Sequence, residues 1–219
     1  KTKKYFINSG EWKGKFLWDL YNQAETPFAW HKKLFSYSKK IGIRCFSTPF
    51  SIRAVELLES LGCPFYKIAS FEMNDLDLIK RVAQTKKEII ISTGMASLKE
   101  IETSYNVAKK NGAKKITLLY CVSKYPSDNK DFNLENIKIL KDKFKCKIGL
   151  SDHSIDDDVA KLAAYLGADL FEKHICLKKN LGLDSKFSIT TKEIPRYKKA
   201  IIKGFELRGE KFFYRNKSE

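Results

Sequence analysis

From residue 43 onward, short apolar and β-branched segments alternate with longer amphipathic ones. Six such segments begin 22 to 31 residues apart, a spacing that leaves room for one crossover helix between successive strands. Apolar strands that alternate with helices predict a parallel sheet covered by helices. The predicted strands are 43–48, 65–70, 88–93, 115–121, 146–151 and 170–175.

The segments between these strands carry the period and the start signals of helices. Ser97 and Glu100 form an S-x-x-E capping box, and Asn74 and Ser154 stand where helix N-caps are expected. A glycine follows two of the apolar stripes, which is typical of a helix end. The predicted helices are 51–61, 74–84, 97–112, 133–144 and 154–167.

Polar residues decide between the two architectures that a parallel sheet allows. They gather at the carboxyl ends of nearly all the predicted strands, as in a (β/α)8 TIM barrel, whose active site draws on many strands. A doubly wound sheet would concentrate them at one switch point, and the G-x-G-x-x-G fingerprint of a dinucleotide fold is absent from the sequence. The strand-end polar residues are Thr48, Ser70, Glu72, Ser92, Thr93, Ser123, Ser151, His153 and His174.

The chain is expected to contain about six of the eight strand–helix units of such a barrel, over residues 43–207. Residues 1–42 have helix-like aromatic segments and are interpreted as a connecting segment, and 208–219 as the start of a linker to a further domain. We expect the first two strands to lie upstream of Lys1, which is not an initiator methionine.

Composition excludes several classes of protein. No apolar run approaches the roughly 20 residues of a membrane span, and no signal peptide is recognisable. The five cysteines have no C-x-x-C spacing, which indicates reduced, cytoplasmic usage. The net charge of +16 is compatible with nucleic-acid binding, but the lysines are spread over the predicted helices and no nucleic-acid-binding motif appears. Attraction of an anionic small substrate is the favoured interpretation.

Three side chains stand out chemically. His153 and His174 end adjacent strands, about 4.8 Å apart in a sheet, so both imidazoles are able to reach one ion, although each alone would more simply be a hydrogen-bonded surface residue. Lys67 lies within an apolar strand, where a lysine is costly unless it meets an anion or its head escapes to solvent. Alternation of the last strand predicts Glu172 on the inner face with His174. His31 lacks such a context and is expected to be structural.

Six segments of the chain resemble the sialic acid synthase family, in the family's order and spacing and over essentially the whole sequence. Two others, 9–35 and 181–190, are similar to the branch of that family that makes pseudaminic acid. The six segments are FSTPF (46–50), YKIASFEMNDLDLI (66–79), ISTGMAS (91–97), LLYCVSKYPS (118–127), IGLSDHS (148–154) and FEKHICL (171–177).

This resemblance implies a role for each matching residue. His153 and His174 would hold a divalent metal, with manganese expected and magnesium or cobalt as alternatives. Glu72 would stand near the reacting carbons, and Tyr125 and Asp184 would lie on the sugar side of the site. Phosphoenolpyruvate would contact Thr48, Lys67, Ser70, Ser92, Ser151 and Ser123, a position that is often Asn in the sialic branch.

The implied reaction joins phosphoenolpyruvate to a 2,4-diacetamido-2,4,6-trideoxy hexose, an amino-sugar aldehyde, and yields pseudaminic acid and phosphate. The alternatives are synthesis of N-acetylneuraminate or legionaminate, another phosphoenolpyruvate aldol-type barrel, and a basic non-catalytic binding module. A cytoplasmic homodimer with no nucleic-acid or membrane partner is expected. The family's first motif, its K-x-Q strand and its C-terminal antifreeze-like domain have no match in the sequence.

Overall fold

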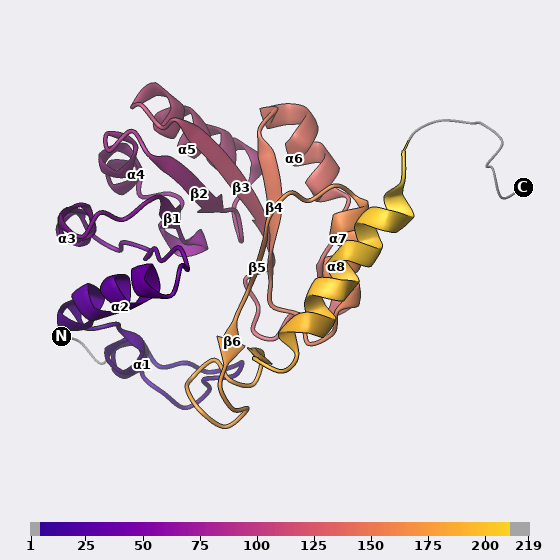
Figure 1. Ribbon diagram of the computed structural model, residues 1–219, viewed down its shortest axis with the longest axis horizontal. Coiled ribbons are helices and arrows are strands. Elements are labelled where there is room, and N and C mark those ends of the chain that lie inside the picture. The colour runs from indigo at the N-terminus through magenta and orange to yellow at the C-terminus, as the bar shows by residue number, and fades with distance from the viewer. Residues whose placement is uncertain (1–4, 211–219) are drawn as a thin grey trace, which may run out of the picture.

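Five parallel strands form the sheet at the centre of the protein, in a computed structural model that describes residues 5–210. The strands lie in chain order β1-β2-β3-β4-β5, so each pairs with the next strand along the sequence. They follow an arc, with the helices on its outer side (Figure 1). The strands are β1 Tyr66–Ile68, β2 Glu88–Ser92, β3 Lys115–Cys121, β4 Lys147–Asp152 and β5 Phe171–Lys173. This arrangement confirms the predicted α/β fold, a part of a (β/α) barrel.

Helices connect the strands and cover the outer side of the sheet. The N-terminal segment adds α1 (Leu17–Ala24) and α2 (Phe28–Lys40), and a small parallel sheet pairs β6 (Ile175–Cys176) with β7 (Ile189–Thr190). Two short 3-10 turns are η1 (Ser70–Glu72) and η2 (Asn129–Asp131). The covering helices are α3 Ile52–Ser60, α4 Leu76–Ala83, α5 Leu98–Lys110, α6 Asn136–Phe144, α7 Asp158–Tyr165 and α8 Ile194–Arg208.

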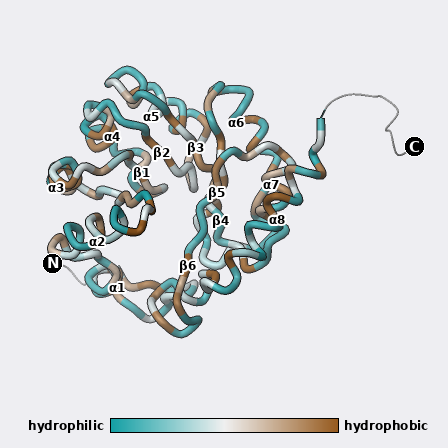
Figure 2. Tube along the Cα trace, viewed as in Figure 1, coloured by the Kyte–Doolittle hydropathy of each residue, from teal (hydrophilic) through white to brown (hydrophobic). Residues whose placement is uncertain are grey.

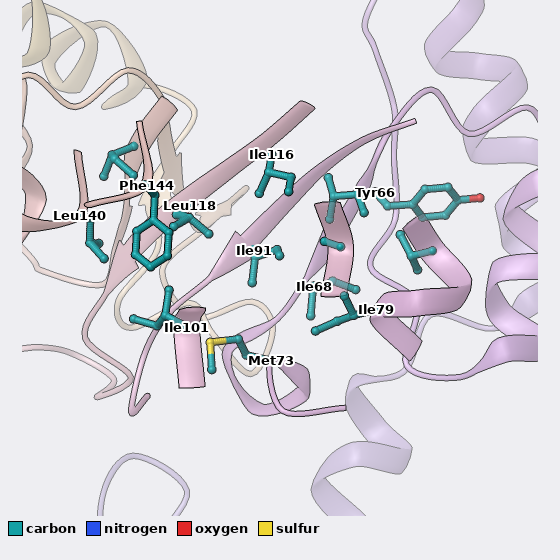
Figure 3. Close-up of a cluster of buried hydrophobic side chains, with 14 of the residues drawn as sticks. Tyr66, Ile68, Met73, Ile79, Ile91, Ile101, Ile116, Leu118, Leu140 and Phe144 are labelled. Atoms are coloured by element: carbon teal, nitrogen blue, oxygen red, sulfur yellow. The ribbon is translucent and has the colours of Figure 1, made fainter. Parts of the chain in front are cut away.

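The core lies between the strands and these helices. Along α7 and α8 the trace alternates between hydrophilic and hydrophobic residues, as expected of helices with one buried side (Figure 2). The side chains of Ile68, Ile79 and Ile91 are fully or almost fully buried in one cluster that spans several elements (Figure 3). Burying one such side chain contributes about 1.5–3 kcal/mol to the free energy of folding. The cluster therefore stabilises the packing of the helices against the strands.

The prediction of a strand over 43–48 is wrong. The chain there forms no strand, and its backbone makes no ladder with β1 or with any other described segment. The segment still packs on the core, since the rings of Phe46 and Phe65 lie 4.3 Å apart. An apolar run becomes a strand only when a neighbour takes its backbone hydrogen bonds, and the described residues supply none here.

Of the three predicted helix N-caps, one is confirmed and two are wrong. Ser97 and Glu100 form the predicted capping box at the start of α5. Asp75, not Asn74, caps α4 by accepting a hydrogen bond from Leu78 N–H. Ser154 does not cap α7, because the helix begins later, with Asp157 at the N-cap position, and the Ser154 hydroxyl donates to the Asp156 carbonyl oxygen. The predicted linker over 208–219 lies, from residue 211 onward, outside the described residues.

Candidate active site

A hollow of about 210 Å³ opens at the carboxyl ends of the strands, on the inner side of the arc. Its lining comes from segments that are far apart in the sequence, and it includes most of the predicted site residues. This is the location that the strand-end polar residues predict for a (β/α) barrel. The predicted residues that line it are Thr48, Lys67, Ser70, Ser92, Tyr125, Ser151, His153 and His174.

The register of β3, β4 and β5 aligns three of the lining side chains. Cys121 lies opposite Ser151, and Ser151 lies opposite Glu172. Ser151 Oγ donates a 2.7 Å hydrogen bond to Glu172 Oε1. Alternation predicts the inward direction of Glu172, whereas the sequence carries no obvious signal for Cys121 beyond its place at a strand end.

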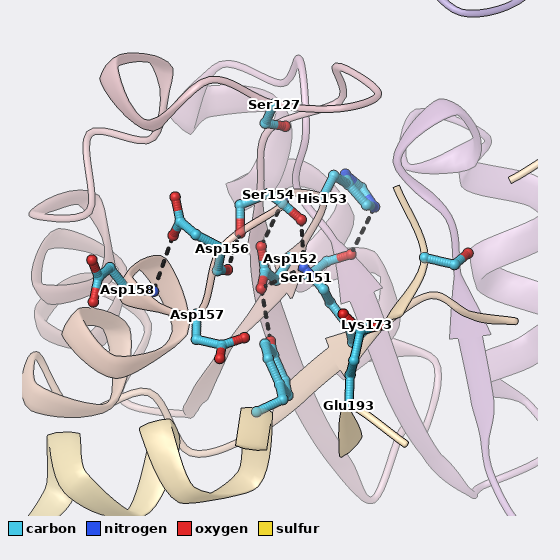
Figure 4. A network of polar contacts seen from close by, with 12 residues as sticks. Ser127, Ser151, Asp152, His153, Ser154, Asp156, Asp157, Asp158, Lys173 and Glu193 are labelled. Carbon is cyan, nitrogen blue, oxygen red and sulfur yellow. Dashed lines mark hydrogen bonds and ion pairs between the residues drawn. The ribbon is translucent and has the colours of Figure 1, made fainter. Parts of the chain in front are cut away.

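The two histidines face each other above this row. Their ring centroids lie 5.3 Å apart. His153 is buried, and its Nδ1 lies 2.9 Å from the Val122 carbonyl oxygen, which only accepts. The proton therefore sits on Nδ1. Nε2 lies 3.5 Å from Ser151 Oγ, but that hydroxyl donates its single proton to Glu172, so the lone pair of Nε2 is available. Burial lowers the pKa of His153 to about 4, so the ring is neutral at neutral pH. Figure 4 shows His153 beyond Ser151 and Asp152 on β4.

His174 follows β5 directly and interrupts the predicted strand 170–175. Its Nδ1 lies 3.3 Å from Asp184 Oδ2, and this contact favours a proton on Nδ1. Asp184, predicted to face the sugar, is thus placed against a histidine ring. Both rings therefore direct Nδ1 to a protein oxygen, which leaves the two Nε2 atoms as potential ligands.

Lys67 reaches the same hollow from β1. Its side chain is 12% exposed, and its ammonium lies 3.5 Å from the Glu172 carboxylate. The nearby hydroxyl of Ser92 is buried and has no hydrogen-bond partner. A buried hydroxyl without a partner costs free energy, and a ligand oxygen would relieve it. Lysine and serine together form a cradle suited to phosphate or carboxylate oxygens.

Two further hydroxyls converge on Gly94, which follows β2. Its N–H donates to Ser70 Oγ at 3.2 Å. A Cβ at this position would lie 2.1 Å from Ser123 Oγ and 2.8 Å from Ser70 Oγ. Ser123 does not line the hollow itself, but its hydroxyl lies beside Cys121 at its edge. Only glycine leaves room for both hydroxyls in this arrangement.

Replacing Gly94 with alanine is expected to displace the Ser70 and Ser123 hydroxyls. Because a serine hydroxyl can rotate away, the loss of stability should be modest, about 1–3 kcal/mol. The affinity for an anion, with inorganic phosphate as the probe, should fall about tenfold, the effect of losing about one charge-assisted hydrogen bond. Calorimetric titration of the full-length variant with inorganic phosphate measures this. Unchanged affinity would show that these hydroxyls do not contact the ligand.

Glu72 lies in η1 and does not line the hollow. Burial raises the pKa of its carboxyl, whereas the charge of Lys67 acts in the opposite direction. Its Oε2 is buried without a hydrogen-bond partner. Glu72 is thus a carboxyl group held near the anion cradle, and it remains a candidate acid or base.

An aromatic wall of Trp12, Tyr125 and Phe187 borders the histidines, and of these only Tyr125 was predicted to belong to the site. The ring of Tyr125 lies 4.2 Å from that of His153, and Phe187 lies 5.0 Å from His174. Trp12, from the N-terminal segment, lies 5.7 Å from Tyr125 and donates from its indole nitrogen to Leu183 O. The wall therefore joins the two segments whose sequences resemble the pseudaminic acid branch.

The other residues of interest fall outside this site. His31 is buried between Pro27 O and Ser47 Oγ, in the structural role expected of it. A hollow of about 280 Å³ on α7 and α8 is lined by aliphatic and aromatic groups with one lysine, a composition unsuited to an anion.

In residues 5–210, no helix is long and apolar enough to cross a membrane. The same residues contain no cluster of three or more side chains arranged as metal ligands.

The parallel arc of five strands defines the chain as part of a (β/α) barrel, and the candidate site lies at the carboxyl ends of its strands. The sequence model of the NeuB family matches residues 1–212, and the chain belongs to that family. This confirms the resemblance seen in the sequence motifs.

Three comparisons support this assignment. The chain is 45% identical over 190 residues to the pseudaminic acid synthase of Helicobacter pylori, covering 86% of this chain and 56% of that protein. It is 42% identical over 178 residues to the N,N'-diacetyllegionaminic acid synthase of Campylobacter jejuni, covering 80% and 53%. The crystal structure of N-acetylneuraminic acid synthetase from Leptospira borgpetersenii superposes with a TM-score of 0.85 at 32% identity, covering 91% and 70%. The chain spans about half the length of the curated relatives it matches.

Proposed function

We propose that the protein containing this chain condenses phosphoenolpyruvate with a 2,4-diacetamido-2,4,6-trideoxy hexose to give pseudaminic acid and phosphate. The observation that carries the proposal is the convergence of Lys67, the unpartnered Ser92 hydroxyl and two facing imidazoles on one hollow. A cation and hydroxyls suit the anionic substrate, and the imidazoles suit a metal that activates an aldehyde.

The donor set fits a divalent metal ion. Each histidine has its Nδ1 next to a protein oxygen, at the Val122 carbonyl and the Asp184 carboxylate, and so presents Nε2. A neutral His153 is the form that binds a metal. We propose manganese, with magnesium or cobalt as alternatives. When bound, such an ion polarises the aldehyde oxygen of the open-chain sugar.

In the proposed reaction, C3 of phosphoenolpyruvate forms a bond to the aldehyde carbon, and the aldehyde oxygen takes up a proton. Water adds to C2, and the C2–O bond to phosphate breaks to leave the 2-keto acid. Lys67 holds the phosphate or carboxylate with the serine hydroxyls and neutralises its charge. Glu72 orients the water or takes its proton, since burial raises the pKa of its carboxyl. Positioning and electrostatics thus supply much of the rate.

Phosphate release by the full-length protein tests the proposal. Phosphoenolpyruvate is supplied with the 6-deoxy diacetamido altrose, with the sugar precursor of legionaminic acid, or with N-acetylmannosamine. We expect the first sugar to give the highest kcat/KM. Preference for the second would favour the legionaminic acid alternative, which the 42% identical relative supports. Preference for a phosphorylated five- or four-carbon sugar would favour another aldol-type barrel.

The basic, non-catalytic module is separated from these enzymes by binding. Salt-dependent retention on nucleic acid, without affinity for phosphoenolpyruvate or manganese, would favour it and reject the proposed reaction.

A Glu72→Gln substitution tests the proposed role of Glu72. Burial raises the pKa of this carboxyl, so its ionised form destabilises the fold above that pKa. We therefore expect the variant to be more stable than the parent at pH 7.5, with a gain that disappears as the pH falls below the carboxyl's unfolded pKa. Turnover should fall about 10²- to 10⁴-fold, as for a lost acid or base.

Thermal unfolding at both pH values and phosphate release measure these effects. Glu56→Gln, at an exposed position of α3, is the matched control and should change neither. A Glu72→Gln variant that is less stable at pH 7.5 would contradict the conclusion that the cost of burying this carboxylate exceeds its favourable interaction with Lys67.

Two properties of the whole protein belong to the same proposal. All five cysteines are free, which supports function in the reducing cytoplasm. Phe50, Phe71 and Met95 are 62–65% exposed near the strand ends, and such apolar groups support the predicted homodimer, in which a partner would cover them. Light scattering of the full-length protein tests the dimer, and a monomer at micromolar concentration would contradict it.

A further inference from the structure

Behind the two histidines, on the side of the sheet away from the hollow, lies a buried ion pair. Asp152 and Lys173 are opposite each other in the register of β4 and β5, and each immediately precedes one of the histidines. Their side chains are 0% and 5% exposed, and Lys173 Nζ lies 2.9 Å from Asp152 Oδ2. Figure 4 shows both residues beneath His153.

The same lysine is bound to both flanks of His153. Its ammonium donates to the Ser154 carbonyl oxygen at 2.6 Å as well as to Asp152. Asp152 Oδ1 in turn accepts from the Ser154 N–H at 2.8 Å. The residues on either side of His153 are thereby attached to Lys173, Asp152 through its carboxylate and Ser154 through its backbone carbonyl, and Lys173 directly precedes His174.

Tyr197 connects this pair to helix α8. Its hydroxyl donates to Asp152 Oδ2 at 2.8 Å, and Lys173 Nζ lies 5.3 Å from the centre of its ring. Each polar group of the network therefore has a partner. A satisfied buried network orders its surroundings, because every rearrangement would leave a charge without compensation.

A contribution to the stability of the fold does not by itself explain this buried network. Burying two charges is costly, and replacing a buried ion pair by neutral groups of similar volume is often neutral or stabilising. Removing one partner only is strongly destabilising, since the other charge remains buried. The contacts with both flanks of His153 point instead to control of geometry.

We propose that Asp152, Lys173 and Tyr197 are positioning residues, which set the separation and orientation of His153 and His174 for a shared divalent cation. This inference rests on the proposed metal site and deepens it. The three residues contact neither the hollow nor a reacting atom. They act through the strand ends, where a small rotation of either backbone would change the separation and orientation of the two rings.

The test uses an Asp152→Asn/Lys173→Met double variant of the full-length protein. Asparagine keeps an oxygen for the Ser154 N–H, and methionine keeps the volume of the lysine stem, so no charge remains buried. We expect the melting temperature to stay within a few degrees of the parent. The dissociation constant for Mn²⁺, measured by calorimetric titration with the metal alone, should rise about 10- to 100-fold, as for partners of metal ligands. Tyr197→Phe should raise it less, about threefold.

The chain supplies a control of similar composition, but more exposed, at the opposite end of the strands. There, Lys87 binds Glu59 at 2.5 Å, and the Tyr66 hydroxyl donates to the same carboxylate. A Glu59→Gln/Lys87→Met variant removes a similar lysine, carboxylate and tyrosine network and should leave Mn²⁺ affinity unchanged.

Three results would overturn the positioning role. They are parental Mn²⁺ affinity in the double variant, an equal loss of affinity in the Glu59/Lys87 control, and failure of the double variant to fold. The His153→Ala variant, titrated alongside, separates this inference from the site on which it rests. If His153→Ala binds Mn²⁺ like the parent, the metal site itself is rejected; if only His153→Ala loses affinity, the positioning role alone is rejected.

Discussion

Alanine in place of His153 or His174 is expected to abolish measurable Mn²⁺ binding and to reduce phosphate release at least about 100-fold. Even the hydrogen-bonding partners of metal ligands are worth about 10- to 100-fold, so loss of a ligand should exceed that effect. The two rings lie 5.3 Å apart, and each presents Nε2. One imidazole by itself supplies only one donor to the ion. Each single alanine variant should therefore lose as much metal affinity as a variant in which both histidines are replaced.

The third histidine provides the control for this experiment. His31 is buried against Pro27 and Ser47 and does not line the hollow, so His31→Ala should keep its Mn²⁺ affinity. Calorimetric titration and phosphate release with added manganese measure both properties. Undiminished turnover in His153→Ala or His174→Ala would reject the metal role of the imidazole pair.

Replacing Lys67 with methionine is expected to lower kcat/KM for phosphoenolpyruvate roughly 100- to 1000-fold, the loss typical of one preorganised charge-stabilising donor. Its ammonium is the cation that lines the hollow, 3.5 Å from Glu172. Methionine keeps the packing of the stem and removes the charge. Mn²⁺ affinity should change much less, because Lys67 contacts neither histidine.

Removal of this cation also affects the fold. Glu172 would keep its hydrogen bond from Ser151 but lose its partner charge in a half-buried position, so a fall in melting temperature is expected. Lys147→Met is the matched control, since Lys147 is exposed at the amino end of β4. Parental kinetics in Lys67→Met would show that the anion binds elsewhere, whereas equal losses in both variants would indicate an effect of net charge alone.

The fold was predictable from the sequence because its strands and helices each carry a local pattern. Alternation within strands and the helical period between them located β1 to β5 and α3 to α7, because each pattern arises from the geometry of its own element. The capping box at Ser97 was predicted for the same reason. Asn74 and Ser154 were misassigned as caps, since several polar residues compete for a helix start and only the backbone path selects one.

In the candidate site, too, residues marked by a local signal were predicted and residues placed by distant contacts were not. Lys67, Ser92, Ser151, His153 and His174 were predicted because each stands in or just after a strand of a parallel sheet, and all such ends meet at one edge. Cys121, Trp12 and Phe187 were not predicted, because their neighbours come from segments up to 171 residues away. Glu172 was expected on the inner face, but its ion pair with Lys67 spans the hollow between β5 and β1.

By itself, the sequence determined the α/β class, the order of the strands and the residues that end them, since these depend on periodicity within short segments. Only the tertiary structure decided that 43–48 is not a strand, that Asp152 and Lys173 form a buried pair and that two rings face each other. Those outcomes depend on which strands are neighbours, on their register and on the curl of the sheet. Contacts of that kind arise from packing between distant segments, which no local pattern encodes.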